Sequence, residues 1–431
     1  MNKILIYFKQ AWNLIKQEKL FSSIYIIGTG LSIMIVMVLA ISLYLKIGNI
    51  YPETHRDRML VMNRAMEKSK EVRSISGLSY PFIETTLLSL KNQVIVTAIT
   101  SSREELYAGT TYDKRKIEVR VKSIDTNFWK VFSFRFIDGK PFTEADYQSE
   151  IKTAVIAESL ARKLFGTTQV TGKYVNLDFT PYRISGVVKD ASFITPETFA
   201  HLWIPHSKSL IKYSHDVTGG LGNFNAYLLV SSVEKLDDTK KEIYENIQKF
   251  NSTLKEGWEF STGGQPDEYW QYVLRAYDME PDFTKIVLQY IFIILILLLI
   301  PAVSLAGMIE SRMERRLAEI GVRRAFGSPI HTIINQIITE NFLFTITGGI
   351  VGLILSFAVF IGGKNWIINI GRSFASFPPE GTETIVYPEM LFNIHVFAIA
   401  LIISFLLNLL CSLIPAWRAS HKEIIYSLNA K

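Results

Sequence analysis

Four long stretches of the chain contain no Asp, Glu, Lys or Arg and consist mainly of apolar residues. Each is long enough to cross a bilayer as a helix, which takes about 20 residues. A soluble protein would have to bury four helices of this length, so the pattern favours a membrane protein with four transmembrane helices. The stretches cover residues 20–45, 286–309, 341–363 and 390–417.

The first stretch shares one feature with a signal peptide, since lysines precede it at positions 3, 9, 16 and 19. The apolar part of a signal peptide is about 7–15 residues long and ends at a small-residue cleavage site. Residues 20–45 are a longer run, and no Ala-x-Ala motif closes it. We interpret it as a retained transmembrane helix. Residues 1–19 mix apolar side chains with lysines, which is typical of an amphipathic helix at the membrane interface.

Residues 46–285 have a mixed pattern. Alternating apolar and polar residues predict strands, and apolar residues three or four positions apart predict helices. The mixture predicts a large α+β domain with two subdomains. The expected strands are 58–65, 93–100, 116–124, 173–178, 182–188 and 225–230, and the expected helices are 82–90, 158–165 and 233–254.

Basic residues are unevenly distributed among the segments that connect the four stretches. Residues 1–19 contain four, residues 310–336 contain five, and the tail after Trp417 contains three, whereas residues 364–389 contain two beside three glutamates. Because Lys and Arg concentrate in cytoplasmic segments, we predict that both termini and 310–336 are cytoplasmic and that 46–285 is extracytoplasmic. The formal charge of +6 is then a topology signal, and nucleic-acid binding is not needed to explain it.

The expected fold class is therefore an integral membrane protein with four α-helical spans and a large α+β extracytoplasmic domain between the first two. The predicted segments are an interfacial helix at 1–19, spans at 20–45, 286–309, 337–363 and 390–417, the extracytoplasmic domain at 46–285, a cytoplasmic loop at 310–336, an external loop at 364–389 and a cytoplasmic tail at 418–431.

Motifs for catalysis or cofactor binding do not fit the sequence. The single cysteine, Cys411, excludes a disulfide framework and a cysteine metal site. The segment from Gly166 to Gly172 encloses five residues where a phosphate-binding loop has four, so we expect a helix C-cap at Gly166 instead. His201 and His206 are not part of an HExxH motif, and no GxSxG occurs. We expect no catalytic residue, bound cofactor or metal on this chain.

A dense group of charges follows the second stretch directly. Residues 310–328 contain five arginines and three glutamates. Residues spaced i, i+4, i+7 and i+11 share one face of a helix, here with an apolar stripe beside it. The charged face consists of Arg312, Arg316, Glu319 and Arg323, and the stripe consists of Met313, Leu317 and Ile320.

After Gly321 the apolar positions change phase, which predicts a break and a short second helix that ends at Gly327. One interpretation is a solvated loop whose arginines only enforce topology. The apolar residues at helical spacing favour a second one, in which the short helix docks onto a cytoplasmic partner. The tip of that helix carries Arg323, Arg324, Ala325 and Phe326.

This loop resembles the loop of the MacB/FtsX-like permeases of ABC transporters. The likeness extends to segments 11–33, 161–190 and 414–420, which resemble the family's entry into the first span, its periplasmic core and its tail. The loop residues that match the family motif are Ser311, Arg312, Glu319, Ile320, Gly321, Arg323, Arg324, Ala325, Phe326 and Gly327, followed by Glu340.

The resemblance implies a permease dimer, of two identical or two different chains, that binds a dimer of cytoplasmic ATPases through this loop as a coupling helix. ATP and Mg²⁺ would be bound by that partner, because this chain contains no fused ATPase. The resemblance also implies mechanical work outside the cytoplasm on a periplasmic or membrane substrate, with a periplasmic adaptor and an outer-membrane duct as further partners. The alternative function is a signalling or hydrolase-regulating module driven by the same coupling, and a third is a membrane-anchored protein without an ATPase.

Small residues four positions apart occur in the first and third stretches, a spacing that lets membrane helices approach closely. Either contact between two chains or packing within one chain would use them. Pro301 is expected to kink the second span, and Glu340, near the start of the third, requires water or a partner such as a loop arginine. The small residues are Gly28, Ser32, Gly348 and Gly352.

Overall fold

The computed structural model forms two compact units. Residues 45–283 lie in the extracytoplasmic unit, and the membrane unit contains residues up to Tyr44 and from Thr284 to Gly371. Isolated positions near the chain ends belong to the described part as well. The structure describes residues 13, 16–17, 19–90, 94–100, 105–110, 116–212, 218–275, 280–296, 322, 325–327, 329–369, 394, 397–399, 401–403, 405–406 and 409–410.

The described residues of the extracytoplasmic unit form one sheet of 15 strands. Most pairs are antiparallel, but β10 with β8 and β11 with β6 are parallel. The strands are β1 (Met59–Met62), β2 (Ala65–Lys68), β3 (Arg73–Leu78), β4 (Val94–Thr100), β5 (Glu105–Gly109), β6 (Ile117–Ile124), β7 (Phe136–Gly139), β8 (Thr153–Ala157), β9 (Tyr174–Leu177), β10 (Thr180–Val188), β11 (Leu202–Pro205), β12 (Leu221–Gly222), β13 (Phe224–Val230), β14 (Glu259–Ser261) and β15 (Asp267–Glu268).

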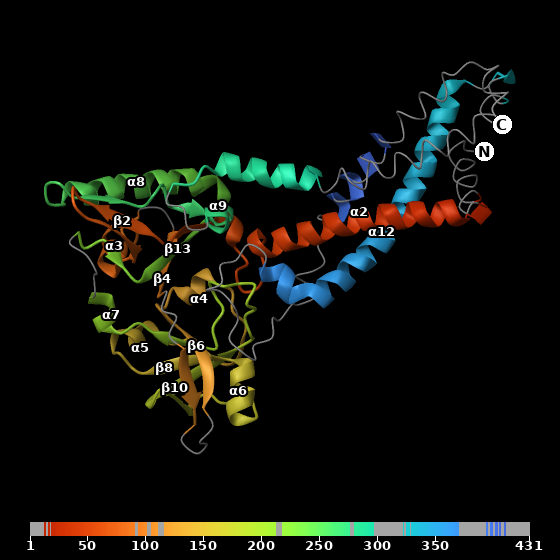
Figure 1. Ribbon diagram of the computed structural model, residues 1–431. Helices are drawn as coiled ribbons and strands as arrows, with labels where there is room; N and C mark the ends of the chain where they lie inside the picture. Colours follow the sequence, from red (N-terminus) through yellow and green to blue (C-terminus); the bar gives the residue numbers. More distant parts are fainter. Residues whose placement is uncertain are drawn as a thin grey trace. The chain divides into compact units, whose positions relative to one another are not determined.

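Helices of this unit cover the sheet in separate places. The buried side chains of α3 and α8 pack against β3, β4 and β13. Figure 1 shows α8 lying along this part of the sheet. At the other end α6 packs against β8 and β10. The helices are α3 (Tyr80–Thr86), α4 (Phe128–Val131), α5 (Glu144–Gln148), α6 (Glu158–Phe165), α7 (Lys208–Lys212), α8 (Leu236–Ser252) and α9 (Tyr269–Arg275), with 3-10 turns at Arg56–Arg58 and Val233–Lys235.

An aromatic cluster fills the middle of the sheet between these two ends. Trp203 is fully buried, and its ring centroid lies 6.2 Å from that of Trp129 and 5.2 Å from that of Phe134. Tyr227 on β13 and Tyr269 on α9 belong to the same cluster. The α+β content expected from the sequence is confirmed, and the division into two subdomains stays a prediction.

Three expected elements differ from the structure. The helix expected at 233–254 begins with a 3-10 turn at Val233–Lys235 and continues as α8, which ends at Ser252. The run expected as one strand at 58–65 is divided into β1 and β2, with a break at Asn63 and Arg64. Helix α3 begins two residues before the expected 82–90 and ends at Thr86. Its start follows from Ser79, whose hydroxyl oxygen accepts a hydrogen bond from the backbone N–H of Phe82 at 3.1 Å and caps the helix.

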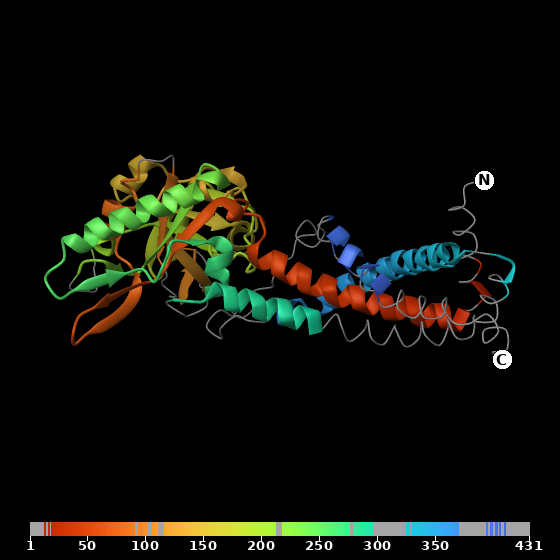
Figure 2. The same ribbon diagram turned by 90° about the horizontal axis from the view of Figure 1, so that it is seen from above.

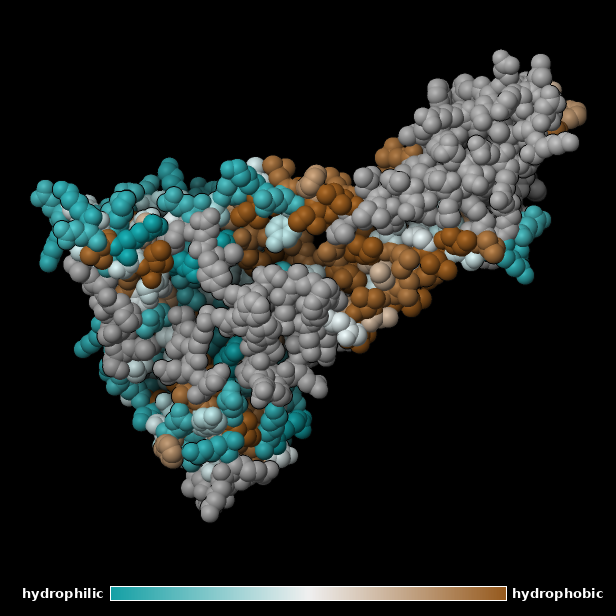
Figure 3. All heavy atoms as spheres, in the orientation of Figure 1, coloured by the Kyte–Doolittle hydropathy of each residue, from teal (hydrophilic) through white to brown (hydrophobic). Residues whose placement is uncertain are grey.

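Among its described residues, the membrane unit contains two helices that are long and apolar enough to span a bilayer. They are α2 (Lys19–Ile47) and α12 (Ile330–Asn369), whose apolar segments run from Ser22 to Ile47 and from Ile334 to Gly363. A shorter apolar helix covers Phe283–Ile296. Hydrophobic side chains dominate the visible surface of α2 (Figure 3). Helix α12 begins inside the segment expected as a cytoplasmic loop, and the count of four spans stays a prediction, since most of 297–321 and 370–431 lies outside the described residues.

Candidate functional site

The expected coupling loop is described only at its C-terminal end. The backbone N–H of Phe326 donates to the carbonyl of Val322 at 3.1 Å, and Gly327 has a φ of +83°. This left-handed conformation ends a helical turn and favours glycine. The Phe326 side chain is 89 % exposed. Arg312, Arg316, Glu319, Ile320, Gly321, Arg323 and Arg324 lie outside the described residues, as does Pro301.

Glycines of α12 contact α2 of the same chain, and Figure 2 shows the two helices, in blue and red, running past one another. A Cβ atom at Gly352 would lie 2.6 Å from the backbone oxygen of Gly30, and one at Gly348 would lie 2.9 Å from Thr29 Cβ. Two of the expected packing residues therefore meet a partner within one chain. On α2 the glycine at the contact is Gly30, which the four-residue spacing of Gly28 and Ser32 missed.

Polar side chains lie along α2 and α12. The hydroxyl of Ser32 donates to the carbonyl of Gly28 at 2.9 Å, so its hydrogen bond is made within α2 and not with α12. Tyr25 on α2 donates to Asn341 Oδ1 on α12 at 3.2 Å. Glu340 is 2 % exposed and accepts a hydrogen bond from Gln336 Nε2 at 3.0 Å. The structure thus gives Glu340 a partner within its own helix, which the sequence interpretation did not consider.

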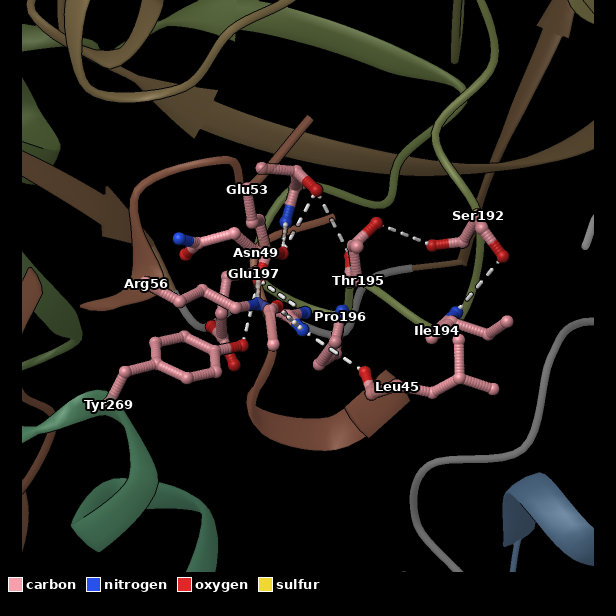
Figure 4. A network of polar contacts seen from close by, with 12 residues as sticks. Leu45, Asn49, Glu53, Arg56, Ser192, Ile194, Thr195, Pro196, Glu197 and Tyr269 are labelled. Atoms are coloured by element: carbon pink, nitrogen blue, oxygen red, sulfur yellow. Dashed lines mark hydrogen bonds and ion pairs between the residues drawn. The ribbon is translucent and has the colours of Figure 1, made fainter. Parts of the chain in front are cut away.

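A buried ion pair lies where α2 ends in the extracytoplasmic unit (Figure 4). Arg56 and Glu53 are fully buried, with Nη2 2.8 Å from Glu53 Oε2 and Nε donating to the same oxygen at 2.9 Å. Arg56 Nη1 donates to the backbone carbonyls of Leu45 and Gly48, each at 3.0 Å. The last carbonyls of a helix have no partner within it, so Arg56 caps the C-terminal end of α2.

The second carboxylate oxygen of Glu53 binds a buried loop. Thr198 donates to Glu53 Oε1 from its backbone N–H at 3.1 Å and from its hydroxyl at 3.0 Å. Tyr269 on α9 donates to Glu53 Oε2 at 2.7 Å, and its ring lies 4.6 Å from the Arg56 guanidinium carbon. Glu53 therefore joins three segments that are far apart in the sequence.

Glu197, next to Thr198, accepts hydrogen bonds from two tyrosine hydroxyls. Tyr272 of α9 donates to Oε1 at 2.7 Å, and Tyr227 of β13 donates to Oε2. Lys122 of β6 donates from Nζ to the backbone carbonyl of Glu197 at 2.6 Å. Residues 191–200 are buried except for Pro196 although they form neither helix nor strand. Buried loops require internal partners for their polar groups, and these side chains supply them.

A second buried ion pair lies at the other end of α9. Arg275 is 4 % exposed and binds Asp267 through two bonds, Nε to Oδ2 at 2.5 Å and Nη2 to Oδ1 at 2.7 Å. Its Nη1 donates to the carbonyl of Gly263 at 2.9 Å. The guanidinium carbon lies 5.6 Å from the ring of Phe283, and the Trp270 ring lies 5.8 Å from the same ring. Phe283 is the first residue of the helix that leads to the second stretch.

The residues considered for catalysis have structural roles in the described part of the chain. Gly166 ends α6 with a φ of +71°, as its sequence context predicts. His201 Nδ1 accepts from the backbone N–H of Arg120 at 3.0 Å, and His206 Nε2 lies 3.0 Å from the carbonyl of Ala98. No group of three potential metal ligands occurs among the described residues.

We expect His206 to make the extracytoplasmic domain labile in acid. Burial lowers the pKa of His206 to about 4, and the hydrogen bond to Ala98 opposes this shift. Above pH 6.5 the imidazole is neutral in both the folded and unfolded states. Between pH 6.5 and 4 only the unfolded state takes up the proton, so the free energy of unfolding falls by about 3 kcal/mol.

His206→Gln keeps a donor for the Ala98 carbonyl and does not titrate, so it should make this part of the pH profile less steep. Burial also lowers the pKa of His201 to about 4, and that contribution stays in the variant. Burial raises the pKa of Asp125 to about 6. This shift makes the folded state more stable as the pH falls, and it does so equally in the wild type and in the His206→Gln variant. The measurement is the unfolding midpoint between pH 7 and 4.5, followed by tryptophan fluorescence. Parallel profiles for the two proteins would contradict the prediction.

Comparison with known proteins assigns the chain to a class. A family model for the MacB-like periplasmic core domain matches residues 22–245, and a model for the FtsX-like permease C-terminal region matches residues 291–424. The chain belongs to the MacB-like family and is an ABC transporter permease of the MacB/FtsX type. Its sheet domain is the extracytoplasmic domain of an inner-membrane protein.

Three curated relatives illustrate the similarity. The chain is 24 % identical over 277 residues to the uncharacterized ABC transporter permease YknZ of Bacillus subtilis, covering 63 % of this chain and 64 % of YknZ. It is 21 % identical over 323 residues to the macrolide export ATP-binding/permease protein MacB of Hahella chejuensis, covering 74 % of this chain and 44 % of that protein. It is 23 % identical over 254 residues to the pyoverdine export ATP-binding/permease protein PvdT of Pseudomonas savastanoi, covering 58 % of this chain and 36 % of that protein. The chain thus spans less than two thirds of the length of each.

Solved structures of domains from such proteins are also similar. The extracellular domain of YknZ from Gram-positive bacteria matches with 18 % identity and a TM-score of 0.30, over 46 % of this chain and 98 % of that domain. The periplasmic region of MacB from Actinobacillus actinomycetemcomitans matches with 20 % identity and a TM-score of 0.33, over 46 % and 89 %.

Proposed function

We propose that this chain is the membrane subunit of an ATP-driven mechanotransmission transporter. A separate cytoplasmic ATPase dimer binds ATP and Mg²⁺ and moves the loop around Phe326. The membrane helices pass this movement to the extracytoplasmic domain, which acts on a periplasmic or membrane substrate for export or extraction. Two permease chains work together, with a periplasmic adaptor and an outer-membrane duct as further partners.

The observation that carries this proposal is the exposure of Phe326. A phenylalanine that is 89 % exposed, directly before a Gly-Ser-Pro turn, presents a large apolar surface to the surroundings. Aromatic side chains that enter a partner's pocket commonly dominate the binding energy of an interface. Arg323 and Arg324 precede Phe326 in the sequence, and the match to the FtsX-like permease region includes all three residues.

We expect Phe326→Ala to weaken retention of the ATPase by about 2 kcal/mol, or roughly thirtyfold, because the apolar anchor is lost. Transport-coupled ATP turnover should fall with it, while expression and membrane insertion stay normal. The measurement is pull-down of the ATPase with the purified permease, together with the ATPase rate of the complex in lipid nanodiscs.

Phe179→Ala is the matched control. Phe179 is also a highly exposed phenylalanine, at 85 %, but it lies in the turn between β9 and β10 of the extracytoplasmic domain. Its removal should leave ATPase binding and turnover unchanged. If Phe326→Ala behaved like this control, the loop would be a topology signal without a partner.

A further inference from the structure

We propose that Arg56 and Arg275 are two clamps that fix the end of α2 and the start of the helix Phe283–Ile296 to the two ends of α9. Through them the extracytoplasmic domain would follow a displacement of either helix. The source of that displacement, a partner ATPase, rests on the function proposed above. The clamps themselves rest on contacts within the extracytoplasmic unit.

The first clamp acts on the end of α2. Arg56 binds the carbonyls of Leu45 and Gly48 on one side and Glu53 on the other, and it is fully buried. The C-terminal end of a helix carries partial negative charge, which a cation stabilises. A guanidinium group presents its donors in a fixed planar fork, so these contacts fix the carbonyls of the last turn of α2 relative to Glu53.

The second clamp acts on the start of the next apolar helix. Arg275 holds Asp267 and the carbonyl of Gly263 in the same planar manner and places its guanidinium group beside the ring of Phe283. Trp270 contacts that ring from the same helix as Arg275. The first residue of the helix is therefore held by two side chains of α9.

Helix α9 connects the two clamps. Its first residue, Tyr269, stacks on Arg56 and donates to Glu53, and its last residue is Arg275 itself. Tyr272, between them, binds Glu197 of the buried loop. One short helix thus contacts Arg56, which binds the end of α2, the first residue of the next apolar helix and the core of the domain.

The chemistry of these contacts favours positioning over simple stabilisation. Apolar residues of similar volume stabilise a protein interior as well as a buried ion pair does, or better. Here each arginine is oriented by a carboxylate and by at least one backbone carbonyl, which fix a geometry that apolar contacts do not. The ends of two helices and the domain would then move as one body.

Hydrogen–deuterium exchange of the full chain in lipid nanodiscs tests the proposal. Glu53→Gln combined with Arg56→Met removes both charges and retains an acceptor for Thr198 and a group of similar size at both positions. We expect amides of 45–58 to exchange about tenfold faster, while amides of β4 and β13 keep their protection. Asp267→Asn combined with Arg275→Met should have the corresponding effect on 263–275 and 280–284.

The matched control is Glu158→Gln combined with Arg162→Met. This pair has the same 2.8 Å separation as the Arg56–Glu53 pair, but the Arg162 side chain is 61 % exposed. It should change exchange nowhere beyond α6. Unchanged exchange at 45–58 would overturn the proposal, because the pair would then not hold this segment. An equal rise throughout the sheet would also overturn it, because the pair would then be a general stabilising contact.

This readout does not depend on the ATPase. If no ATPase binds the wild-type permease, the function proposed above fails, and the exchange experiment still decides whether the clamps exist. If an ATPase binds, the Glu53→Gln/Arg56→Met variant should keep ATP turnover and lose transport. Transport at the wild-type level in a variant with loosened 45–58 would overturn the role of the clamp in transmission.

Discussion

Replacing Arg275 by methionine is expected to lower the free energy of unfolding of the extracytoplasmic domain by about 3–5 kcal/mol, because Asp267 is left as a buried charge without its partner. Asp267 is 2 % exposed, and both of its carboxylate oxygens accept from Arg275. Chemical unfolding of the purified permease, followed by tryptophan fluorescence, measures the loss.

Removing both charges should cost much less than removing one. In the Asp267→Asn/Arg275→Met variant no charge stays buried, so we expect most of the stability to return. Lys208→Met, at a pair with Glu150 whose side chains are 59 % and 46 % exposed, should change stability by less than about 1 kcal/mol. A double variant as unstable as Arg275→Met alone would contradict this account.

Replacing Gly352 by alanine should separate α2 from α12 and cost about 1–3 kcal/mol in helix packing. The added Cβ would lie 2.6 Å from the backbone oxygen of Gly30 and 2.9 Å from Ile33 Cβ. A backbone atom cannot rotate away, so the helices must move apart. The measurement is thermal unfolding in detergent, with disulfide trapping between cysteines placed on α2 and α12 in a Cys411→Ser background.

Gly362→Ala supplies the matched control on the same helix. A Cβ at Gly362 meets nothing within 4 Å, and alanine favours a helix over glycine by about 1 kcal/mol. This variant should therefore be as stable as the wild type or slightly more stable. Equal effects at positions 352 and 362 would show that the contact with Gly30 does not limit the approach of the helices.

Local sequence patterns predicted some elements to the residue and missed others. Helix α6 has the expected bounds because an apolar stripe at helical spacing ends at a glycine in the left-handed conformation. Strand β8 was missed, since all five of its residues are buried and a short apolar run without alternation does not distinguish strand from helix. The break between β1 and β2 depends on pairing with distant strands, on which the local pattern carries no information.

The polar network around Glu53 could not be predicted from the sequence pattern. Glu53 and Arg56 resemble any exposed pair three residues apart, and Thr198 and Tyr269 are 145 and 216 residues away from Glu53. Only the folded sheet brings these segments together. Small residues in the membrane stretches did indicate close helix packing, but the four-residue spacing selected Gly28 and Ser32 on α2, whereas the contact with Gly348 and Gly352 is made by Thr29, Gly30 and Ile33.

The pairing of β1 has a consequence for biogenesis. Strand β1 is buried along its whole length, and its neighbours are β13 and β15, near the C-terminal end of the domain. Pairing between distant segments slows folding, and the domain is synthesised from its N-terminal end. An apolar strand therefore has no strand partner until the chain as far as β13 has been synthesised.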